Sequence, residues 1–283
     1  MADVAGPGLA LLSSGLWGTA DFAGGVVSRR LPPVAVVAWS QAAGLVGVSI
    51  AVLATGAWQG STAWLGWALL AGASGASALV AFYAALASGT MGVVSPIAAL
   101  GAVVPVGVGV ATGERPTMLQ VAGIAVALCG AALASGPDLS ASREAPARAR
   151  PVVLAVLAAV GFGVALVAIG RGSESSTLMT LVGMRATSVA AFAVAAVVLR
   201  TVGGVQPRDL AVLGCVGLAD AGANLAFGVA STLGLLSVTA VLGSLYPVMT
   251  VLLARIVLHE RLSRVQQVGV AAALSGVVLL SAG

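Results

Sequence analysis

The chain has the composition of a membrane protein. Of its 283 residues, 59% are hydrophobic and 8% are charged, whereas soluble domains average about 45–50% apolar and about 25% charged residues. A mean hydropathy of +1.10 excludes a soluble enzyme, a disordered regulator and a disulfide-stapled secreted module. The formal net charge is +4, but the 13 basic residues, all of them Arg, stand between apolar runs without forming a stripe or patch. We therefore expect no nucleic-acid partner.

Ten apolar runs have about the length of a membrane-spanning helix, which needs about 20 mostly apolar residues. In chain order they are residues 9–27, 34–53, 63–87, 91–111, 118–134, 152–169, 178–199, 210–230, 233–258 and 265–280. Most connections are a few residues long, so consecutive helices are expected to be antiparallel. The long middle connection carries charges and prolines. The sequence therefore predicts a five-helix unit at 1–135, a polar linker at 136–151 and a second five-helix unit at 152–283.

The two units share an internal repeat. TMGVVSPIAALGAVVP from Thr90 matches TLGLLSVTAVLGSLYP from Thr232, and the Glu-Arg-x-Thr-x-x-Gln-x-x-Gly run from Glu114 recurs with Ser for Thr from Glu260. Each unit holds an odd number of helices, so the second copy enters the membrane from the opposite side, as in many secondary transporters. The predicted fold is an all-α membrane protein with ten transmembrane helices, arranged as two inverted five-helix repeats around a central cavity.

The repeated motifs also predict positions for bending and gating. Pro105 and Pro247 lie inside apolar runs, where a proline kinks a helix, and each follows a glycine by one helical turn. We expect gating or structural roles at Gly101, Pro105, Glu114, Gly243, Pro247 and Glu260.

Both halves close with Pro, then Glu-Arg, then Gln-x-x-Gly, and both carry an early aromatic-Gly pair, Trp17-Gly18 and Phe162-Gly163. These features resemble the drug/metabolite transporter superfamily, EamA-like branch, from residue 9 to the C-terminus. The resemblance implies a ten-helix basket in the plasma (inner) membrane that exports small metabolites, amino acids or xenobiotics. It implies no nucleotide hydrolysis, so we expect neither an enzyme nor a cofactor or metal. The chain has no Gly-x-x-x-x-Gly-Lys loop and no Lys to complete one.

Polar residues inside the apolar runs are the candidates for a substrate site. A charge at the centre of a membrane helix costs roughly 2.5–3.5 kcal/mol on insertion scales, so such residues usually face a cavity or a partner. Asp220 and Asn224 are spaced i,i+4, and Arg185 is the approximate repeat equivalent of Gln41. The predicted substrate-binding residues are Trp17, Asp21, Gln41, Tyr83, Arg185, Asp220, Asn224 and Tyr246.

Two interpretations of the charged residues stay open. In the first, Arg185 attracts an anionic or zwitterionic substrate, while Asp220 or Asp21 pairs with it or carries a coupling proton. In the second, Asp220 and Arg185 form a buried pair that holds helices together, and Asp21 belongs to the membrane interface near Arg29 and Arg30. For Trp17, Tyr83 and Tyr246 the alternative is ordinary packing.

The predicted function is a secondary active exporter of a small zwitterionic or anionic metabolite, with alternating access and proton coupling. Efflux of multiple drugs or cationic compounds is the alternative, and a channel or a non-transporting scaffold is more distant. The Gly72-Ala73-Ser74-Gly75 run matches an intramembrane hydrolase pattern, but the only His, His259, stands in a connection. The expected partners are a small-molecule substrate, the lipid bilayer and protons, with monomer and homodimer both open.

The arginines predict an orientation. Ten of them are assigned to the first, fifth, seventh and ninth connections, and only Arg115 and Arg171 to the opposite side. The positive-inside rule then places both termini outside the cytoplasm, whereas the resemblance implies termini inside. Cys129 and Cys215 fall in apolar runs, where we expect small buried residues rather than a disulfide.

Overall fold

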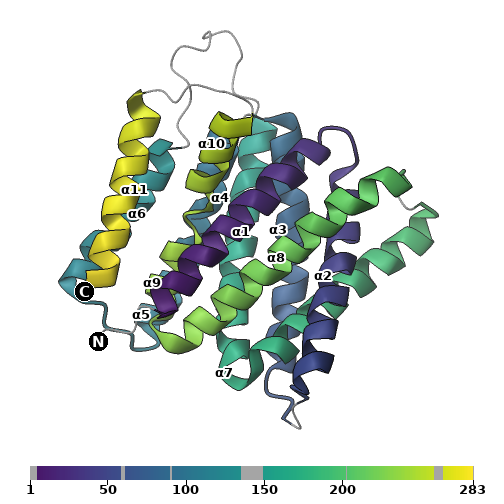
Figure 1. The fold of residues 1–283 in the computed structure, drawn as a ribbon, viewed down its shortest axis with the longest axis horizontal. Coiled ribbons are helices and arrows are strands. Elements are labelled where there is room, and N and C mark those ends of the chain that lie inside the picture. The colour runs from purple at the N-terminus through teal and green to yellow at the C-terminus, as the bar shows by residue number, and fades with distance from the viewer. Residues whose placement is uncertain are drawn as a thin grey trace.

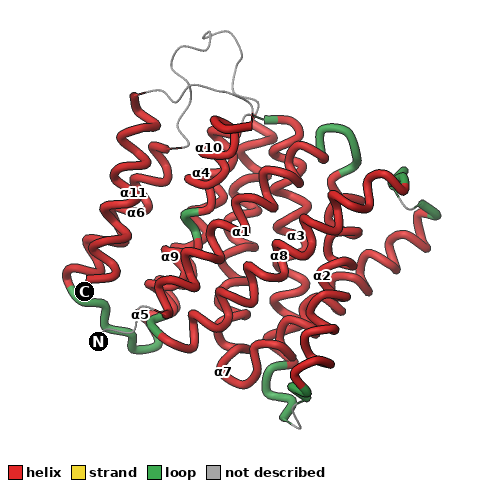
Figure 2. Tube along the Cα trace, viewed as in Figure 1, coloured by secondary structure: helices red, strands yellow, loops and turns green. Residues whose placement is uncertain are grey.

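The described residues form a bundle of helices packed side by side, without a strand (Figures 1 and 2). The computed structural model describes residues 5–58, 61–89, 91–134, 149–201, 203–257 and 264–282. The helices are α1 (Ala5–Val27), α2 (Pro33–Thr55), α3 (Leu65–Ser88), α4 (Met91–Ala99), the 3-10 turn η1 (Leu100–Ala102), α5 (Val103–Ala111), α6 (Met118–Ala134), α7 (Ala149–Leu199), α8 (Pro207–Leu233), α9 (Leu236–Gly243), α10 (Tyr246–Val257) and α11 (Arg264–Ala282). Residues 136–148 of the predicted linker and Glu260 lie outside these ranges.

The label α7 covers two helices, which correspond to the predicted runs at 152–169 and 178–199 and are separated by a kink at the extended residue Ser176. Two other runs differ from the prediction. The run at 91–111 is divided into α4, η1 and α5, and the run at 233–258 into α9 and α10. Each divided run has its break about one turn before or directly at the repeated proline, because proline lacks the N–H that a continuous helix needs.

Four described helices are long and apolar enough to cross a membrane by length and composition: Pro33–Thr55, Leu65–Ser88, Arg150–Val198 and Pro207–Leu233. Shorter apolar helices of 10–17 residues follow at Ile97–Ala111, Met118–Leu133, Leu236–Thr250 and Gln267–Leu280. The exact number of spans is therefore not given by helix length alone, since breaks shorten some apolar runs and the label α7 covers two helices.

Glycines let neighbouring helices approach to backbone contact. A Cβ on Gly130 of α6 would overlap the backbone of Ala273 in α11, and one on Gly276 of α11 would lie 2.7 Å from Cα of Ala127 in α6. Such small-residue contacts are the usual interface of membrane helices. As a result, α6 and α11 form a pair along one side of the bundle (Figure 1). In the main body α1 packs on α8, and α3 packs on α7.

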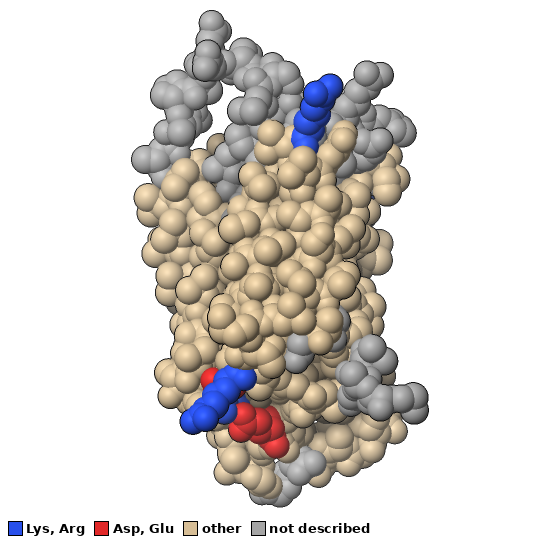
Figure 3. Space-filling model, turned by 90° about the vertical axis from the view of Figure 1, so that its left-hand side faces the viewer, with Lys and Arg blue, Asp and Glu red and all other residues tan. Residues whose placement is uncertain are grey.

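The molecular surface matches a lipid environment. On the face shown in Figure 3, charged side chains lie near the two ends, and the broad band between them carries none among the described residues. Large apolar side chains are exposed on many helices, for example Val46, Leu53 and Val197. The expectation that Cys129 and Cys215 are buried is wrong, since both are exposed free cysteines, as small apolar residues facing lipid can be.

Candidate functional site

A cavity lies between residues of both halves of the chain. Side chains of α1, α2, α3, α4, η1, α7, α8 and α10 line it, and its empty volume is about 690 Å³, including open space at its mouth. Its lining is mostly apolar with a few polar side chains, as in many sites for small organic molecules.

Two interrupted helices meet this cavity at equivalent positions of the repeat. The 3-10 turn Leu100–Ala102 in the first half aligns with Leu242, Gly243 and Ser244 at the α9–α10 break in the second. Gly101 and Ala102 line the cavity from one break, and Ser244 and Tyr246 from the other. Interrupted helices in matching positions of two repeats are the strongest indication of a transporter's binding site.

Prolines and glycines account for both breaks. Pro105 and Pro247 have no N–H, so the carbonyls of Gly101 and Gly243 lack the i+4 donor of a regular α-helix, and that of Gly101 accepts from Val103 instead. Gly101 packs against the backbone of α7, where an added Cβ would overlap the carbonyl of Ala159. Gly243 faces Trp17, and a Cβ there would lie 3.2 Å from its ring. A flexing role for these positions remains a prediction.

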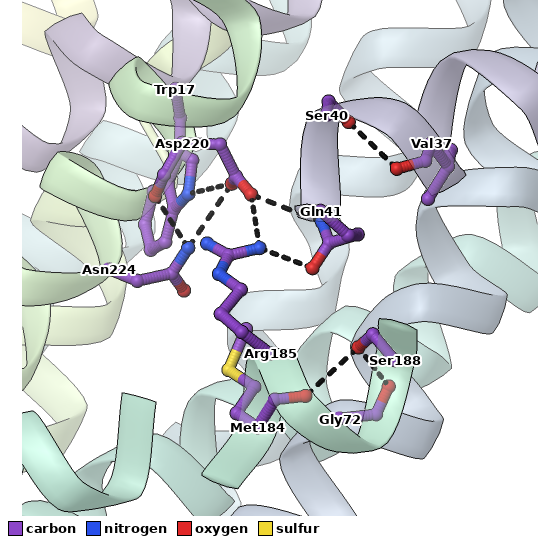
Figure 4. Close-up of polar contacts among 10 residues, drawn as sticks. All are labelled: Trp17, Val37, Ser40, Gln41, Gly72, Met184, Arg185, Ser188, Asp220 and Asn224. Atoms are coloured by element: carbon purple, nitrogen blue, oxygen red, sulfur yellow. Dashed lines mark hydrogen bonds and ion pairs between the residues drawn. The ribbon is translucent and has the colours of Figure 1, made fainter. Parts of the chain in front are cut away.

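Asp220, in the middle of α8, is the centre of a buried hydrogen-bond network (Figure 4). Its Oδ2 forms an ion pair with Nη1 of Arg185 at 2.7 Å and accepts a hydrogen bond from Nε2 of Gln41 at 3.4 Å. Its Oδ1 accepts hydrogen bonds from Nε1 of Trp17 and Nδ2 of Asn224, both at 3.1 Å. Arg185 also donates to Oε1 of Gln41. The network joins α1, α2, α7 and α8.

Arg185 stands behind this network rather than on the cavity wall. Its side chain is 0% exposed, and it is not among the residues that line the cavity, whereas Gln41 and Asp220 are. Gly44 leaves room for the guanidinium, since a Cβ there would lie 3.3 Å from Nε. Nε and Nη2 have no hydrogen-bond partner in the described part of the chain. The positive charge of Arg185 is thus compensated by Asp220 and shielded from the cavity.

Asp21 is a second carboxylate on the cavity wall, and its environment differs. It is 8% exposed and accepts a hydrogen bond from the hydroxyl of Tyr83. Gly24, one turn later on α1, leaves space for that hydroxyl, which a Cβ would overlap. Among the described residues the ion pairs are Arg30–Asp209, Arg171–Glu174 and Arg185–Asp220. Asp21 is in none of them.

Aromatic rings complete the wall around these carboxylates. Trp17 packs on Phe227 with ring centroids 5.7 Å apart, and its donation to Asp220 fixes the indole. Phe82 packs on Phe162 and on Tyr246 in T-shaped arrangements, with ring centroids 5.6 and 6.3 Å apart. Tyr246 is 7% exposed and lines the cavity, but its hydroxyl has no hydrogen-bond partner within the described ranges.

Glu114 connects the two halves at a distance from the cavity wall. Its carboxylate accepts hydrogen bonds from the backbone N–H groups of Leu236 at 2.7 Å and Ser237 at 3.1 Å, at the beginning of α9. A carboxylate is stabilised there because the unpaired N–H groups and the helix dipole favour negative charge. Beside this contact, Nη2 of Arg171 donates to Oγ1 of Thr112 at 2.6 Å. The repeat equivalent of Glu114, Glu260, lies outside the described residues.

Of the eight predicted substrate residues, the structure brings six onto the cavity wall: Trp17, Asp21, Gln41, Asp220, Asn224 and Tyr246. Tyr83 and Arg185 lie behind the wall and hold Asp21 and Asp220, respectively. Ser74 of the hydrolase-like pattern is half-buried and donates to the carbonyl of Leu70 in its own helix.

Sequence reasoning missed the apolar part of the wall. Phe162, Leu166, Ile169 and Met184 of α7 line the cavity, together with Leu79 of α3 and Ser244 at the α9–α10 break. The repeat register could have found two of them. Aligning Trp17 with Phe162 also aligns Asp21 with Leu166.

The comparisons with known proteins decide the family. The model of the EamA-like transporter family matches residues 4–136 and 149–282, which together are nearly the whole chain. The chain belongs to the EamA-like transporter family. It is therefore a multi-pass membrane protein of a transporter family of the drug/metabolite type, and that family is not one of enzymes.

The fold has a close counterpart among solved structures. One described only as "Crystal structure of protein" is 21% identical and superposes with a TM-score of 0.77, covering 97% of this chain and 95% of its own. At that identity the likeness shows the EamA-like fold and nothing of the substrate. No curated protein matches the chain.

Proposed function

We propose that this protein is a secondary active transporter that moves a small zwitterionic metabolite out of the cell by alternating access. The observation that carries the proposal is the cavity between the two family-matched segments, which both interrupted helices and residues of the Asp220 network line. The binding of substrate and coupling ion at interrupted helices is the general design of such transporters.

Helix pairing supports an inverted repeat of ten spans. Counting α4–η1–α5 and α9–α10 as one span each, and α7 as two, gives five spans in each half. The extensive pairings of α1 with α8 and of α3 with α7 are related by exchange of the two halves, and α6 with α11 is a self-related pair. This pattern is expected of two units related by a two-fold axis, and an odd number of spans in each unit puts that axis in the membrane plane.

We propose that Glu114 closes one end of the transport pathway. Its hydrogen bonds run from the first half to α9 of the second half, so rocking of one half on the other has to break them. By the same repeat, Glu260 is proposed to act at the opposite end. Gly101 with Pro105 and Gly243 with Pro247 are proposed as the flexing points between these ends.

The arginines support an orientation with the termini outside the cytoplasm. The beginning of α1 and the end of α11 lie at the lower left of Figure 1, whereas the α1–α2 connection, which holds Arg29 and Arg30, lies at the top. Under the positive-inside rule the top faces the cytoplasm of the plasma membrane. Cytoplasmic accessibility of a terminal tag would contradict this orientation.

The substrate preference follows from the charges that reach the cavity. Arg185 attracts an anion only if it is free, and here Asp220 compensates it. A zwitterion therefore finds its ammonium partner at Asp21 and a remaining N–H at Nε2 of Gln41, since the N–H groups of Trp17 and Asn224 already donate to Asp220. Proton coupling is proposed through one of the two carboxylates. Efflux of cationic compounds is the second candidate, favoured by the absence of an ion-pair partner for Asp21 among the described residues.

A metabolite-resolved efflux screen of cells with and without the protein tests the function, followed by transport in reconstituted vesicles. We expect a saturable flux that depends on an ion gradient. A flux that is not saturable indicates a channel, and no flux in either direction indicates a scaffold. In the same vesicles, unchanged transport and pH dependence of Asp220→Asn exclude Asp220 from coupling.

A further inference from the structure

The cavity has a polar wall and an apolar wall, and the repeat register shows how they differ. The polar residues of α1 and α8 have apolar repeat equivalents in α7 and α3. The aligned pairs are Trp17 with Phe162, Asp21 with Leu166, Asp220 with Ala78, and Asn224 with Phe82. Each half therefore contributes one polar and one apolar helix to the cavity wall, α1 and α3 from the first half and α8 and α7 from the second, so the cavity is amphipathic.

The charges on the polar wall do not cancel. Asp220 is neutralised by Arg185, with Gln41, Trp17 and Asn224 filling its other acceptor positions. Asp21 faces the same cavity, and the hydroxyl of Tyr83 is its one described hydrogen-bond partner. A carboxylate held in an apolar, poorly solvated site without a basic neighbour is stabilised by taking up a cation or a proton.

The surroundings of Asp21 suit an ammonium group. Trp17 lies one helical turn before it on α1 and also lines the cavity, as a cation–π partner would. Tyr246 contributes a buried hydroxyl that has no hydrogen-bond partner in the described chain and that can accept an N–H. The charged and titratable groups facing Asp21 are Asp220 from α8, Tyr83 from α3, Tyr246 from α10 and, behind Asp220, Arg185 from α7. The packed helices α2 and α9 bring none.

We propose that the substrate is a small amphipathic amine, whose ammonium group binds Asp21 and whose apolar body packs on Phe162, Leu166 and Met184. A proton and this ammonium compete for the same carboxylate, so the substrate leaves as Asp21 is protonated. The proposal rests on the proposed transport function and specifies the substrate class of its site. An amino acid with a large apolar side chain and a simple arylalkylamine both belong to this class.

Binding of three matched probes tests the assignment. Phenethylamine, 3-phenylpropionate and 3-phenylpropan-1-ol share a phenyl ring and a short chain but carry a cation, an anion and a neutral hydroxyl. Calorimetry is done with the full-length protein in lipid nanodiscs, between about pH 5.5 and pH 8, where the amine stays protonated as a lysine does. We expect the amine to bind about tenfold or more tightly than the alcohol, the anion to bind weakest, and amine affinity to fall as the pH is lowered.

Substitutions in the polar wall and in the apolar wall test the contribution of each wall to binding. Asp21→Asn is expected to bring amine affinity down to that of the alcohol and to abolish its pH dependence, while Asp21→Glu retains the preference. Phe162→Ala is expected to weaken amine and alcohol by a similar factor. Glu174→Gln, which removes an exposed carboxylate outside the cavity, is the matched control and leaves all three affinities unchanged.

Three outcomes overturn the inference. They are tighter binding of the anion than of the amine, an amine preference that survives Asp21→Asn, and equal or absent binding of all three probes. Uptake of the amine into proteoliposomes keeps this result apart from the function itself. Amine binding without uptake leaves the ammonium site standing and contradicts transport, whereas uptake of other solutes without amine binding contradicts only the ammonium site.

Discussion

The ion pair between Arg185 and Asp220 provides the most quantitative prediction. Arg185 is 0% exposed and its Nη1 lies 2.7 Å from Asp220. Removing one partner of a buried ion pair leaves an uncompensated charge and typically costs about 3–5 kcal/mol of stability. Because Nε and Nη2 of Arg185 have no hydrogen-bond partner in the described ranges, little else compensates the guanidinium. We therefore expect Asp220→Asn to destabilise the protein by about 3–5 kcal/mol.

The internal repeat suggests a second substitution, at Arg185, which completes a double-mutant cycle with Asp220→Asn. Arg185→Gln introduces the residue that stands at the approximately equivalent position of the first half, Gln41. In the double variant Arg185→Gln/Asp220→Asn neither member of the ion pair is charged, so the two polar side chains can hydrogen-bond as neutral groups. We expect it to be more stable than Asp220→Asn alone by about 2 kcal/mol or more.

Reversible unfolding in mixed micelles, followed by tryptophan fluorescence, measures all four proteins of this cycle. Additive effects of the two substitutions, with no coupling energy between them, would refute the reasoning. That result would mean that the network positions side chains without contributing a charge-compensating pair to stability.

Three further substitutions test other contacts. Glu114→Gln weakens the charge-assisted hydrogen bonds from two backbone N–H groups, which are worth about 1.5–3 kcal/mol. We therefore expect spin-label distances between the α5–α6 connection and the start of α9 to become longer. An unchanged distance distribution excludes a gating role. Gly24→Ala displaces the Tyr83 hydroxyl and is expected to lower the free energy of unfolding by about 1–3 kcal/mol. Gly15→Ala on the same helix is the control and is expected to cause no such loss, because nothing lies within 4 Å of the added Cβ. Equal effects of the two substitutions on thermal unfolding contradict the packing argument. Gly130→Ala forces α6 and α11 apart at a backbone contact and should also cost about 1–3 kcal/mol in thermal unfolding, and a stability gain there would contradict the close approach.

The fold was largely predictable because the signal was strong in two independent ways. Apolar runs locate membrane helices without any tertiary information, and the matches from Thr90 and Thr232 and from Glu114 and Glu260 divide the chain into halves. The helix breaks were less predictable in form. Pro105 and Pro247 predict that the helix is interrupted. Whether the interruption is a 3-10 turn or an open turn depends on the packing of Gly101 against α7 and of Gly243 against Trp17.

The candidate site was predictable where polarity marks it and unpredictable where it does not. Asp21, Asp220 and Asn224 stand out in apolar runs, because polar groups are costly in a membrane span and usually face a cavity or a partner. Leu166 and Met184 carry no such mark, since lipid-facing and cavity-facing apolar residues look alike in sequence. Which charge reaches the cavity also depends on geometry alone, and only the structure distinguishes the shielded Arg185 from the accessible Asp21.

The central claim is that one cavity between two halves opens alternately to the two sides of the membrane. Ser244 lines that cavity at the α9–α10 break and is buried, so a cysteine there reports access directly. In a protein whose exposed Cys129 and Cys215 are replaced by alanine, Ser244→Cys is labelled with a membrane-impermeant thiol reagent added to either side of oriented vesicles. Alternating access predicts labelling from both sides, each reduced by bound substrate. Labelling from one side only, under every condition of substrate and ion gradient, would contradict it.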